Sequence, residues 1–134
     1  MEYSPKDYVK LIGGLKESYV VYGSRRLGKR FFHKSFLFYF GNIILTKLIN
    51  LKYNSKLTDV MTCYKIFPKD LFNEISLKSK SFDFEIEITK EILKRRIKIK
   101  EVPISYNPRM EGKKIKYLDG ILCLYKIMEM KYAR

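Results

Sequence analysis

The stretch YVVYGSR at residues 19–25 predicts a short strand that ends in a basic loop. Its first four residues are aromatic or β-branched, which favours an extended chain. Gly23 and Ser24 are turn formers and stop the strand. The loop that follows carries Arg25 and Arg26 and runs to residue 30 without a hydrophobic period.

A helix is predicted before this strand. Ser4 can cap it, Pro5 fits its first turn, and Asp7 lies near its positive end. Its apolar stripe has helical spacing and consists of Tyr8, Leu11, Ile12 and Leu15. Gly13 and Gly14 weaken the end of this helix.

The remaining chain alternates between helical and extended patterns. In order, the sequence predicts an apolar helix over 31–51 interrupted at Gly41-Asn42, a turn at 53–55, a strand at 63–67, a short helix opened by Pro68, a helix over 84–96, a strand at 97–102 that Pro103 either ends or places at a sheet edge, a polar loop over 107–114 and a last helix over about 117–132. The buried face of the helix over 84–96 is expected to consist of Ile86, Ile88, Ile92 and Leu93.

This order of elements is an α/β pattern with about three strands and flanking helices. The sequence has no internal repeat or linker, so residues 1–134 are expected to form a single domain. The first helix has no strand before it, and the chain therefore reads as a fold entered halfway through.

Charge is the strongest feature of the composition. The 134 residues carry 28 Lys and Arg against 14 Asp and Glu, a formal net charge of +14. Such a field favours phosphates, polyanions or an anionic membrane surface as partners. A general lysine bias of the sequence is the alternative explanation. Hydrophobic residues make up 46%, which allows a real core.

The expected location is the cytoplasm, at most peripheral at the cytoplasmic face of a membrane. Cys63 and Cys123 have no metal-ligand spacing and are expected to be buried, reduced thiols. No signal peptide is evident at the start. The longest uncharged stretch, 35–46, is shorter than the roughly 18–20 residues that span a bilayer.

Four segments, in order along the chain, resemble the family 2 glycosyltransferases of the dolichol-phosphate-mannose-synthase-like kind. They are VVYGSR at 20–25, LTDVMTCYK at 57–65, FEIEI at 84–88, and EVPISY at 101–106 with Arg109 and EGKKI at 111–115. The resemblance covers nearly the whole chain.

The resemblance implies the C-terminal half of a GT-A (Rossmann-like) fold. It also implies transfer of a sugar from a nucleotide-sugar to a polyprenyl phosphate by inverting, metal-assisted displacement. The family's nucleotide-binding half and its Mg²⁺- or Mn²⁺-binding carboxylates would lie before Met1. We therefore expect this chain to be a partial domain that binds no metal and is inactive alone. A separately encoded N-terminal half is a further candidate partner.

Arg25 and Asp59 are the leading site candidates. By resemblance, Arg25 faces phosphate oxygens, which guanidinium binds with two donors. Asp59 is the candidate catalytic carboxylate, and since a phosphate acceptor is already ionised, it would orient groups or tune charge. A solvated loop arginine and a turn-capping aspartate are the alternatives. Arg26 is expected to be a surface charge.

A second basic group lies near the C-terminus. Arg109, Lys113 and Lys114 are expected to close over a diphosphate, with a mobile charged loop as the alternative. The acids Asp83, Glu85 and Glu87 are no substitute for the metal motif, and Glu85 and Glu87 do not share a helix face.

The aromatic residues of the helix over 31–51 allow two interpretations, a core helix or an interfacial helix that meets a lipid acceptor. His33 is expected at the surface rather than in catalysis.

Besides a glycosyltransferase fragment, the sequence allows two further hypotheses. A non-enzymatic basic module that binds nucleic acid or membranes fits the charge, but no nucleic-acid-binding motif is present, so nucleic acid is not expected as a partner. The third hypothesis is one half of a split enzyme. The donor sugar is not readable from these residues.

Overall fold

The computed structural model describes residues 3–28, 36–79, 81, 83–108 and 116–129. Within these residues the elements follow in the order α1 (Asp7–Gly14), β1 (Val20–Ser24), α2 (Phe36–Tyr53), β2 (Lys65–Ile66), α3 (Lys69–Glu74), α4 (Phe84–Lys94), β3 (Ile99–Pro103) and α5 (Tyr117–Glu129). This order confirms the α/β class and the alternation predicted from the sequence.

The described strands form one mixed sheet in the order β2-β1-β3. β1 runs parallel to β3, from the pair Val20↔Ile99 to the pair Ser24↔Pro103. β2 is antiparallel to β1 and contributes the pair Val21↔Ile66. Because β1 lies between the other two strands, its carboxyl end at Ser24 stands at the middle of the sheet edge.

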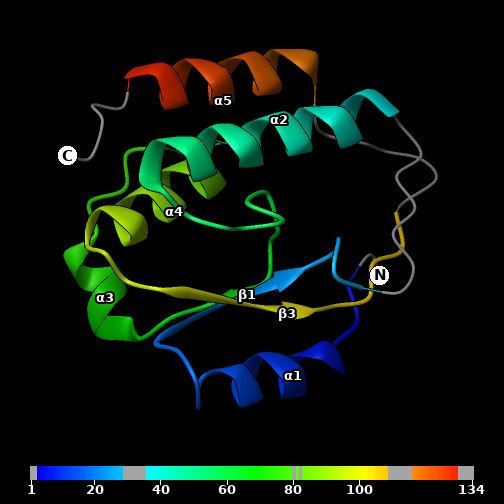
Figure 1. Cartoon of the computed structure of the whole chain (residues 1–134), viewed down its shortest axis with the longest axis vertical. Helices are drawn as coiled ribbons and strands as arrows, with labels where there is room; N and C mark the ends of the chain where they lie inside the picture. Colours follow the sequence, from blue (N-terminus) through cyan, green and yellow to red (C-terminus); the bar gives the residue numbers. More distant parts are fainter. Residues whose placement is uncertain (1–2, 29–35, 80, 82, 109–115, 130–134) are drawn as a thin grey trace.

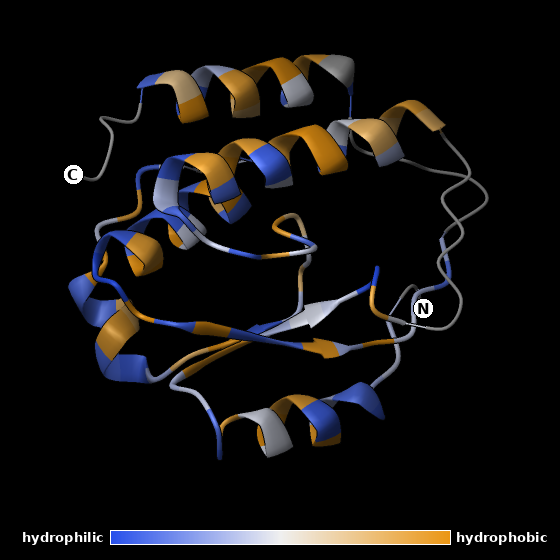
Figure 2. Cartoon of the chain, viewed as in Figure 1, coloured by the Kyte–Doolittle hydropathy of each residue, from blue (hydrophilic) through white to orange (hydrophobic). Residues whose placement is uncertain are grey.

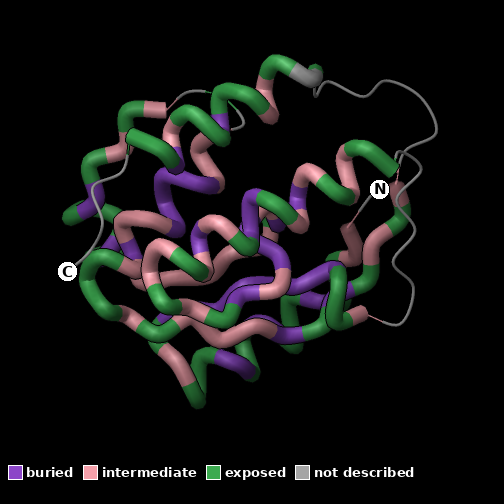
Figure 3. The backbone as a smooth tube through the Cα atoms, turned by 45° about the horizontal axis from the view of Figure 1, so that its top comes forward, coloured by how far each residue is buried: buried purple, intermediate pink, exposed green. Residues whose placement is uncertain are grey.

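Helices cover both faces of the sheet (Figure 1). α1 packs on one face against β1 and β3, whereas α4 lies over the other face and α2 and α5 form a further layer beyond it. β1 is buried along its whole length. In Figure 3, buried residues gather at the centre of the molecule. A central strand covered on both faces reads as a continuous hydrophobic run, which is the pattern of residues 19–22.

Three apolar clusters correspond to these layers. Leu11, Val21 and Val102 join α1 to the sheet. The opposite face of β1 packs on α3 and α4 through Val20, Tyr22, Leu71, Ile75, Ile88 and Ile92. The outer layer is held by Leu45, Ile49, Leu57, Val60, Ile86, Cys123 and Ile127. Ile86, Ile88 and Ile92 are buried as predicted, while Leu93 is half-buried.

α1 differs from its predicted capping and stripe. The residue before the helix is Lys6, without a side-chain cap, and Ser4 contributes its carbonyl oxygen to the Asp7 amide instead. Leu11 is buried, but Tyr8, Ile12 and Leu15 are exposed. The helix meets the sheet along the narrow line of Leu11 and Gly14, where a Cβ on Gly14 would lie 2.9 Å from Val21 Cγ1. Such a narrow contact leaves the rest of the stripe uncovered.

α2 continues without a break through Gly41 and Asn42, contrary to the predicted interruption. Asn42, Leu45, Thr46 and Ile49 are buried, whereas Phe36 and Phe40 are exposed. The aromatic helix is therefore half core and half surface. Residues 31–35, which include His33, lie outside the described residues. The predicted turn at 53–55 is confirmed, with Asn54 in the left-handed region at φ 50°.

The other strands and helices keep their predicted places with shifted ends. The strand predicted at 63–67 is limited to Lys65–Ile66, and Cys63 is exposed rather than buried. Cys123 is buried as expected. Pro68 precedes α3, as predicted. β3 begins at Ile99 and includes Pro103. Proline has no backbone N–H, and it is tolerated here because β3 lies at the edge of the described sheet.

No helix in the described part of the chain combines the length and hydrophobicity needed to cross a membrane. Figure 2 shows hydrophobic residues along both α2 and α5, the two helices of the outer layer.

Candidate functional site

Arg25 and Asp59 form a buried ion pair directly after β1. The Asp59 carboxylate accepts hydrogen bonds from Arg25 Nε and Arg25 Nη2, each at 2.7 Å, and from the Arg25 backbone amide at 3.0 Å. Arg25 is 8% exposed and Asp59 0%. This two-point geometry fixes the plane of the guanidinium as well as its position.

The pair holds both groups in their charged forms. Burial alone would raise the pKa of the Asp59 carboxyl, but the hydrogen bonds and charge of Arg25, helped by Asn42, hold that pKa below its ordinary value. Burial disfavours the charged guanidinium, yet the hydrogen bonds and charge of Asp59 raise the pKa of Arg25. An ionised carboxylate with its oxygens occupied by donors is a poor general base.

α2 supports the carboxylate from behind. Asn42 Nδ2 donates to Asp59 Oδ1 at 3.0 Å, and Thr46 Oγ1 donates to Asn42 Oδ1 at 3.2 Å. The Val60 amide in turn donates to Thr46 Oγ1 at 3.3 Å. These buried polar groups lie one helical turn apart on α2, so the helix that the sequence marked as aromatic also holds the site.

An aromatic group covers the other side of Arg25. Arg25 Cζ lies 5.2 Å from the centre of the Tyr106 ring, within the range of a cation–π contact. The Tyr3 ring lies 5.3 Å from Tyr106 and 4.7 Å from Tyr64, and Tyr3 forms a β-bridge with Tyr106. Arg25 is thus enclosed by a carboxylate on one edge and a tyrosine on one face.

Asp7 anchors the same region, in a role that the sequence did not suggest. Its buried carboxylate accepts the Ser105 amide at 2.7 Å and pairs with Lys10 at 2.6 Å. The contact with Ser105 joins the start of α1 to the residue before Tyr106. The prediction of a helix-end charge was therefore incomplete, because Asp7 also binds a distant backbone group.

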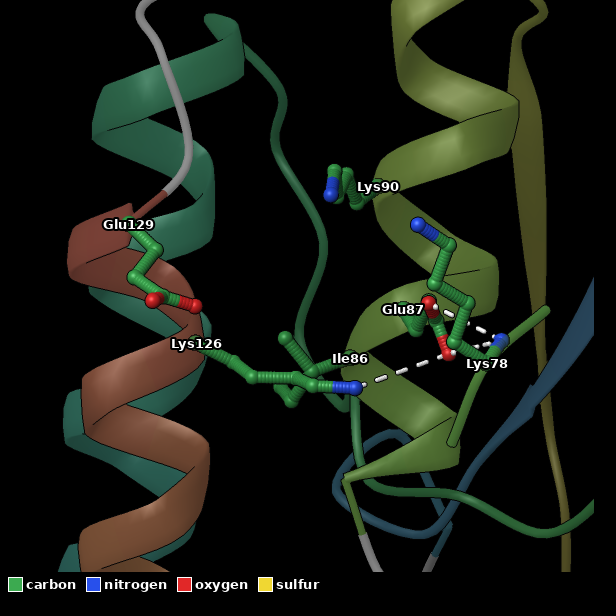
Figure 4. A pocket seen from close by; sticks show the side chains of 6 residues that line it. All are labelled: Lys78, Ile86, Glu87, Lys90, Lys126 and Glu129. Carbon is green, nitrogen blue, oxygen red and sulfur yellow. Dashed lines mark hydrogen bonds and ion pairs between the residues drawn. The ribbon is translucent and has the colours of Figure 1, made fainter. Parts of the chain in front are cut away.

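The acids at the start of α4 serve separate structural contacts. Glu85 pairs with the buried Lys65 of β2. Glu87 accepts the Lys78 and Ser79 amides, and Lys126 of α5 lies 3.6 Å from it and 2.7 Å from Asp83. Figure 4 shows Lys126 reaching from α5 toward Glu87 at the wall of a cavity of about 400 Å³. Glu85 and Glu87 thus contact different parts of the molecule, which agrees with the prediction that they do not share a helix face.

An apolar groove of about 340 Å³ lies between α2 and α5. Its lining consists of Leu37, Phe38, Gly41, Asn42, Ile44, Leu45, Met61, Asp119, Gly120, Ile121, Cys123 and Leu124. Asn42, which donates to Asp59, also lines this groove, so the groove adjoins the ion pair.

The predicted site residues are only partly brought together. Arg25 and Asp59 are in contact, and Arg26 is exposed with Nη1 donating to the Thr58 carbonyl oxygen at 3.1 Å. Arg109, Lys113 and Lys114 lie outside the described residues. Within the described ranges, no group of three or more His, Cys, Asp and Glu side chains is arranged to hold a metal ion.

Sequence reasoning missed Asn42, Thr46 and Glu101 as members of this site. The available signal was polarity at positions where the helical or extended pattern demands an apolar residue. Asn42 and Thr46 lie on the buried line of α2, and the Glu101 carboxylate accepts the backbone amide of Asp59.

Two curated proteins of Haloferax volcanii are similar to the chain. Glycosyltransferase AglJ is 31% identical over 111 residues, which is 82% of this chain and 37% of AglJ. Low-salt glycan biosynthesis hexosyltransferase Agl6 is 32% identical over 69 residues, which is 52% of this chain and 17% of Agl6. The chain therefore spans well under half the length of either relative.

No protein-family model matches the chain, and no solved structure matches it significantly. Both curated relatives carry a sugar-transferring activity in their names. By sequence, the chain is a distant relative of glycosyltransferases.

Proposed function

We propose that this chain supplies the acceptor-phosphate site of a family 2 glycosyltransferase of the dolichol-phosphate-mannose-synthase-like kind, with a GT-A fold. The reaction is transfer of a sugar from a nucleotide-sugar to a polyprenyl phosphate. The observation that carries the proposal is the Arg25 guanidinium, fixed by Asp59 at the carboxyl end of the central strand. Ligands of α/β sheets commonly bind at this end of the strands.

Arg25 is oriented before any ligand arrives. Its bonds to Asp59 use Nε and Nη2, and no hydrogen bond described for these residues uses Nη1. That nitrogen carries two further N–H donors, which suit phosphate oxygens. Because Asp59 neutralises the charge of Arg25 locally, the long-range attraction of a phosphate comes from the +14 net charge of the chain.

Asp59 acts in this proposal as a positioning residue. A phosphate monoester is ionised near neutral pH, so its oxygen needs no base before it attacks. That oxygen forms a bond to the anomeric carbon of the donor sugar, while the bond from this carbon to the diphosphate oxygen breaks. The nucleoside diphosphate leaves with the electron pair, and the sugar configuration inverts.

The leaving diphosphate, the metal ion and the donor nucleotide involve other residues than Arg25 and Asp59. Arg109, Lys113 and Lys114 remain predicted contacts to the leaving diphosphate. The family uses Mg²⁺ or Mn²⁺, but the described residues do not fit such an ion, so no step is derived through it. The donor nucleotide is proposed to bind to an amino-terminal half that is not among these residues.

The exposed apolar side chains of the outer layer favour a membrane surface as a second partner. Phe36, Leu37, Phe40 and Ile44 of α2 and Leu118, Ile121, Leu122 and Met128 of α5 are exposed. α2 carries no acidic residue and the chain is strongly basic. We therefore propose a peripheral position at an anionic membrane, where the lipid acceptor resides.

Binding of a short polyprenyl phosphate tests the proposal. Calorimetry would compare farnesyl phosphate with farnesol, below their micelle-forming concentrations, on the wild-type chain and on the Arg25→Lys and Arg26→Lys variants. We expect binding of the phosphate, weaker binding of the alcohol, and loss of the difference only in Arg25→Lys. Equal affinity for phosphate and alcohol in the wild type would contradict the proposal.

A further inference from the structure

The segment that carries Asp59 has no regular secondary structure. Residues 55–63 lie between α2 and β2 outside any helix or strand. Backbone amides of such a segment need partners other than a hydrogen-bond ladder, because an unpaired buried amide is costly. Here the partners of the Thr58 and Asp59 amides come from one side chain on a distant strand.

That side chain is Glu101. Its carboxylate accepts the Thr58 amide at 2.8 Å, the Asp59 amide at 3.0 Å and Thr58 Oγ1 at 2.9 Å. Both carboxylate oxygens are used: Oε1 accepts the Asp59 amide, Oε2 accepts Thr58 Oγ1, and the Thr58 amide is shared between Oε2 at 2.8 Å and Oε1 at 3.0 Å. A carboxylate that accepts two successive amides fixes the direction of the peptide between them, and with it the direction of the Asp59 side chain.

Glu101 has a rigid base. It lies on β3 and pairs in register with Tyr22 of β1. Tyr22 is fully buried, and its hydroxyl is 2.9 Å from Thr89 Oγ1 of α4. Ser24 Oγ of β1 also lies 2.6 Å from Thr58 Oγ1. The two parallel strands therefore hold the same residue pair, Thr58 and Asp59, from two directions.

The cost of this arrangement indicates a specific role. Burial raises the pKa of Glu101, and the nearby Asp59 charge raises it further against the hydrogen bonds from Thr58 and Asp59. A second carboxylate beside Asp59 adds repulsion between like charges, which a neutral acceptor at this position would avoid. If Glu101 only anchored the turn, one neutral acceptor for each of the two amides would be enough. The buried carboxylate therefore indicates a role beyond anchoring.

We propose that Glu101 is a positioning residue of the phosphate site, because its carboxylate orients the Thr58–Asp59 peptide and thereby the Arg25 guanidinium. The identity of the ligand in this inference rests on the proposed function, whereas the role of Glu101 in orienting Asp59 and Arg25 does not. Removing the negative charge of Glu101 weakens its hydrogen bonds to both amides and to Thr58 Oγ1. The Thr58–Asp59 peptide is then held less firmly, and the Asp59 carboxylate holds Arg25 at two points for less of the time.

Glu101→Gln in the whole chain is the test, because glutamine keeps the shape of the side chain and removes its charge and one acceptor oxygen. The control is Glu17→Gln, which removes a carboxylate paired with the neighbouring Lys100 at the surface. In ¹⁵N-labelled protein, the Arg25 Nε–H resonance and the Thr58 and Asp59 amide exchange rates report the geometry. Calorimetry with farnesyl phosphate reports binding, and thermal unfolding reports the fold.

In Glu101→Gln we expect faster exchange of Arg25 Nε–H and about tenfold weaker binding of farnesyl phosphate, in line with one charged hydrogen bond. Glu17→Gln should leave both unchanged. An unaltered Arg25 Nε–H resonance with unaltered affinity in folded Glu101→Gln would overturn the inference. If the wild type does not bind the phosphate while Glu101→Gln still frees Arg25 Nε–H, the proposed function fails and the positioning role stands.

Should Glu101→Gln not fold, Thr58→Val carries the same test. Valine retains the backbone amide and removes only the Oγ1 contacts with Glu101 and Ser24. Exchange of Arg25 Nε–H should then accelerate by about tenfold, since the hydrogen bond from Thr58 Oγ1 to the Glu101 carboxylate is lost together with the contact to Ser24. No acceleration in folded Thr58→Val would count against the inference.

Discussion

Arg25 and Asp59 are 34 residues apart in the chain and are joined by three hydrogen bonds in the interior. Two of them come from the guanidinium and one from the backbone amide of the same arginine. A pair of this kind depends on both partners, because either charge left alone in the interior is poorly solvated.

Removing one partner should therefore cost far more than removing both. We expect Arg25→Met to lower the free energy of unfolding by about 3–5 kcal/mol, and Arg25→Met with Asp59→Asn to recover part of that loss, because asparagine removes the unpaired charge and keeps an acceptor oxygen. Urea unfolding of both variants measures this difference. The more exposed pair of Lys100 and Glu17 is the control, and Lys100→Met should cost at most about 1 kcal/mol. Additive losses in the double variant would contradict a coupled pair.

Acid should destabilise the protein through Asp59. The pKa of Asp59 is lower in the fold than in the unfolded chain, so the unfolded chain binds more protons in acid. The stability from this carboxylate is present above about pH 4, the ordinary range of Asp, and is lost as the pH falls through the folded pKa. Glu101, with a raised pKa, has the opposite sign, since its contribution is lost as the pH rises.

The midpoint of thermal unfolding between pH 7 and pH 3 measures this effect. The acid limb should be shallower in Asp59→Asn than in the wild type, because the variant lacks the titrating group. Identical acid limbs in the two proteins would show that Asp59 does not carry the acid sensitivity.

Adjacent glycines of α1 should respond to alanine in opposite directions. A Cβ on Gly13 meets nothing within 4 Å, so Gly13→Ala should stabilise the helix by up to about 1 kcal/mol. A Cβ on Gly14 lies 2.9 Å and 3.2 Å from the two methyl carbons of Val21, so Gly14→Ala forces α1 away from the sheet. Thermal unfolding of the two variants compares them, and equal stabilisation by both would contradict the packing of α1 on β1.

The exposed face of the outer layer should bind anionic membranes. Sedimentation with vesicles should show more protein on phosphatidylglycerol than on phosphatidylcholine, with the difference reduced by salt. Phe36→Ser should weaken the binding, whereas Val9→Ser on α1 should not. The two side chains are 76% and 74% exposed, and Figure 1 shows α1 and α2 on opposite sides of the molecule. Equal binding to both lipids by folded protein would favour a role of this face in protein contacts.

Periodicity predicted the order of the elements and the interior of α4. It identified which residues of α1 share a face, but not how much of that face the sheet covers, and so Tyr8, Ile12 and Leu15 were expected inside. Coverage depends on the distance between layers, which here is set by the small Gly14. The helical period also gives no reason to place the polar Asn42 inside the protein. Its side-chain amide donates a hydrogen bond to Asp59, which lies in a segment without helical or extended periodicity.

The candidate site was predictable in part. The order of the four family-like segments indicated Arg25 and Asp59, and a buried pairing of the two was not expected. The pairing of β1 with β3 places Glu101 opposite Tyr22. From this position Glu101 accepts the Thr58 amide, and in our proposal this contact orients Asp59 toward Arg25. The apolar pattern of a strand indicates which of its side chains share a face, but not which residue of a distant strand lies opposite each of them.

Sugar transfer by a completed enzyme tests the central claim most directly. The chain would be joined to the amino-terminal domain of a related glycosyltransferase and assayed with polyprenyl phosphate, GDP-mannose or UDP-glucose, and Mn²⁺. Arg25→Lys keeps the charge but loses the planar two-point geometry, so activity should fall roughly ten- to a hundredfold in folded protein. Arg26→Lys, at the exposed neighbour, should be nearly silent. Equal activity of the two variants, both folded, would show that Arg25 is not the phosphate ligand.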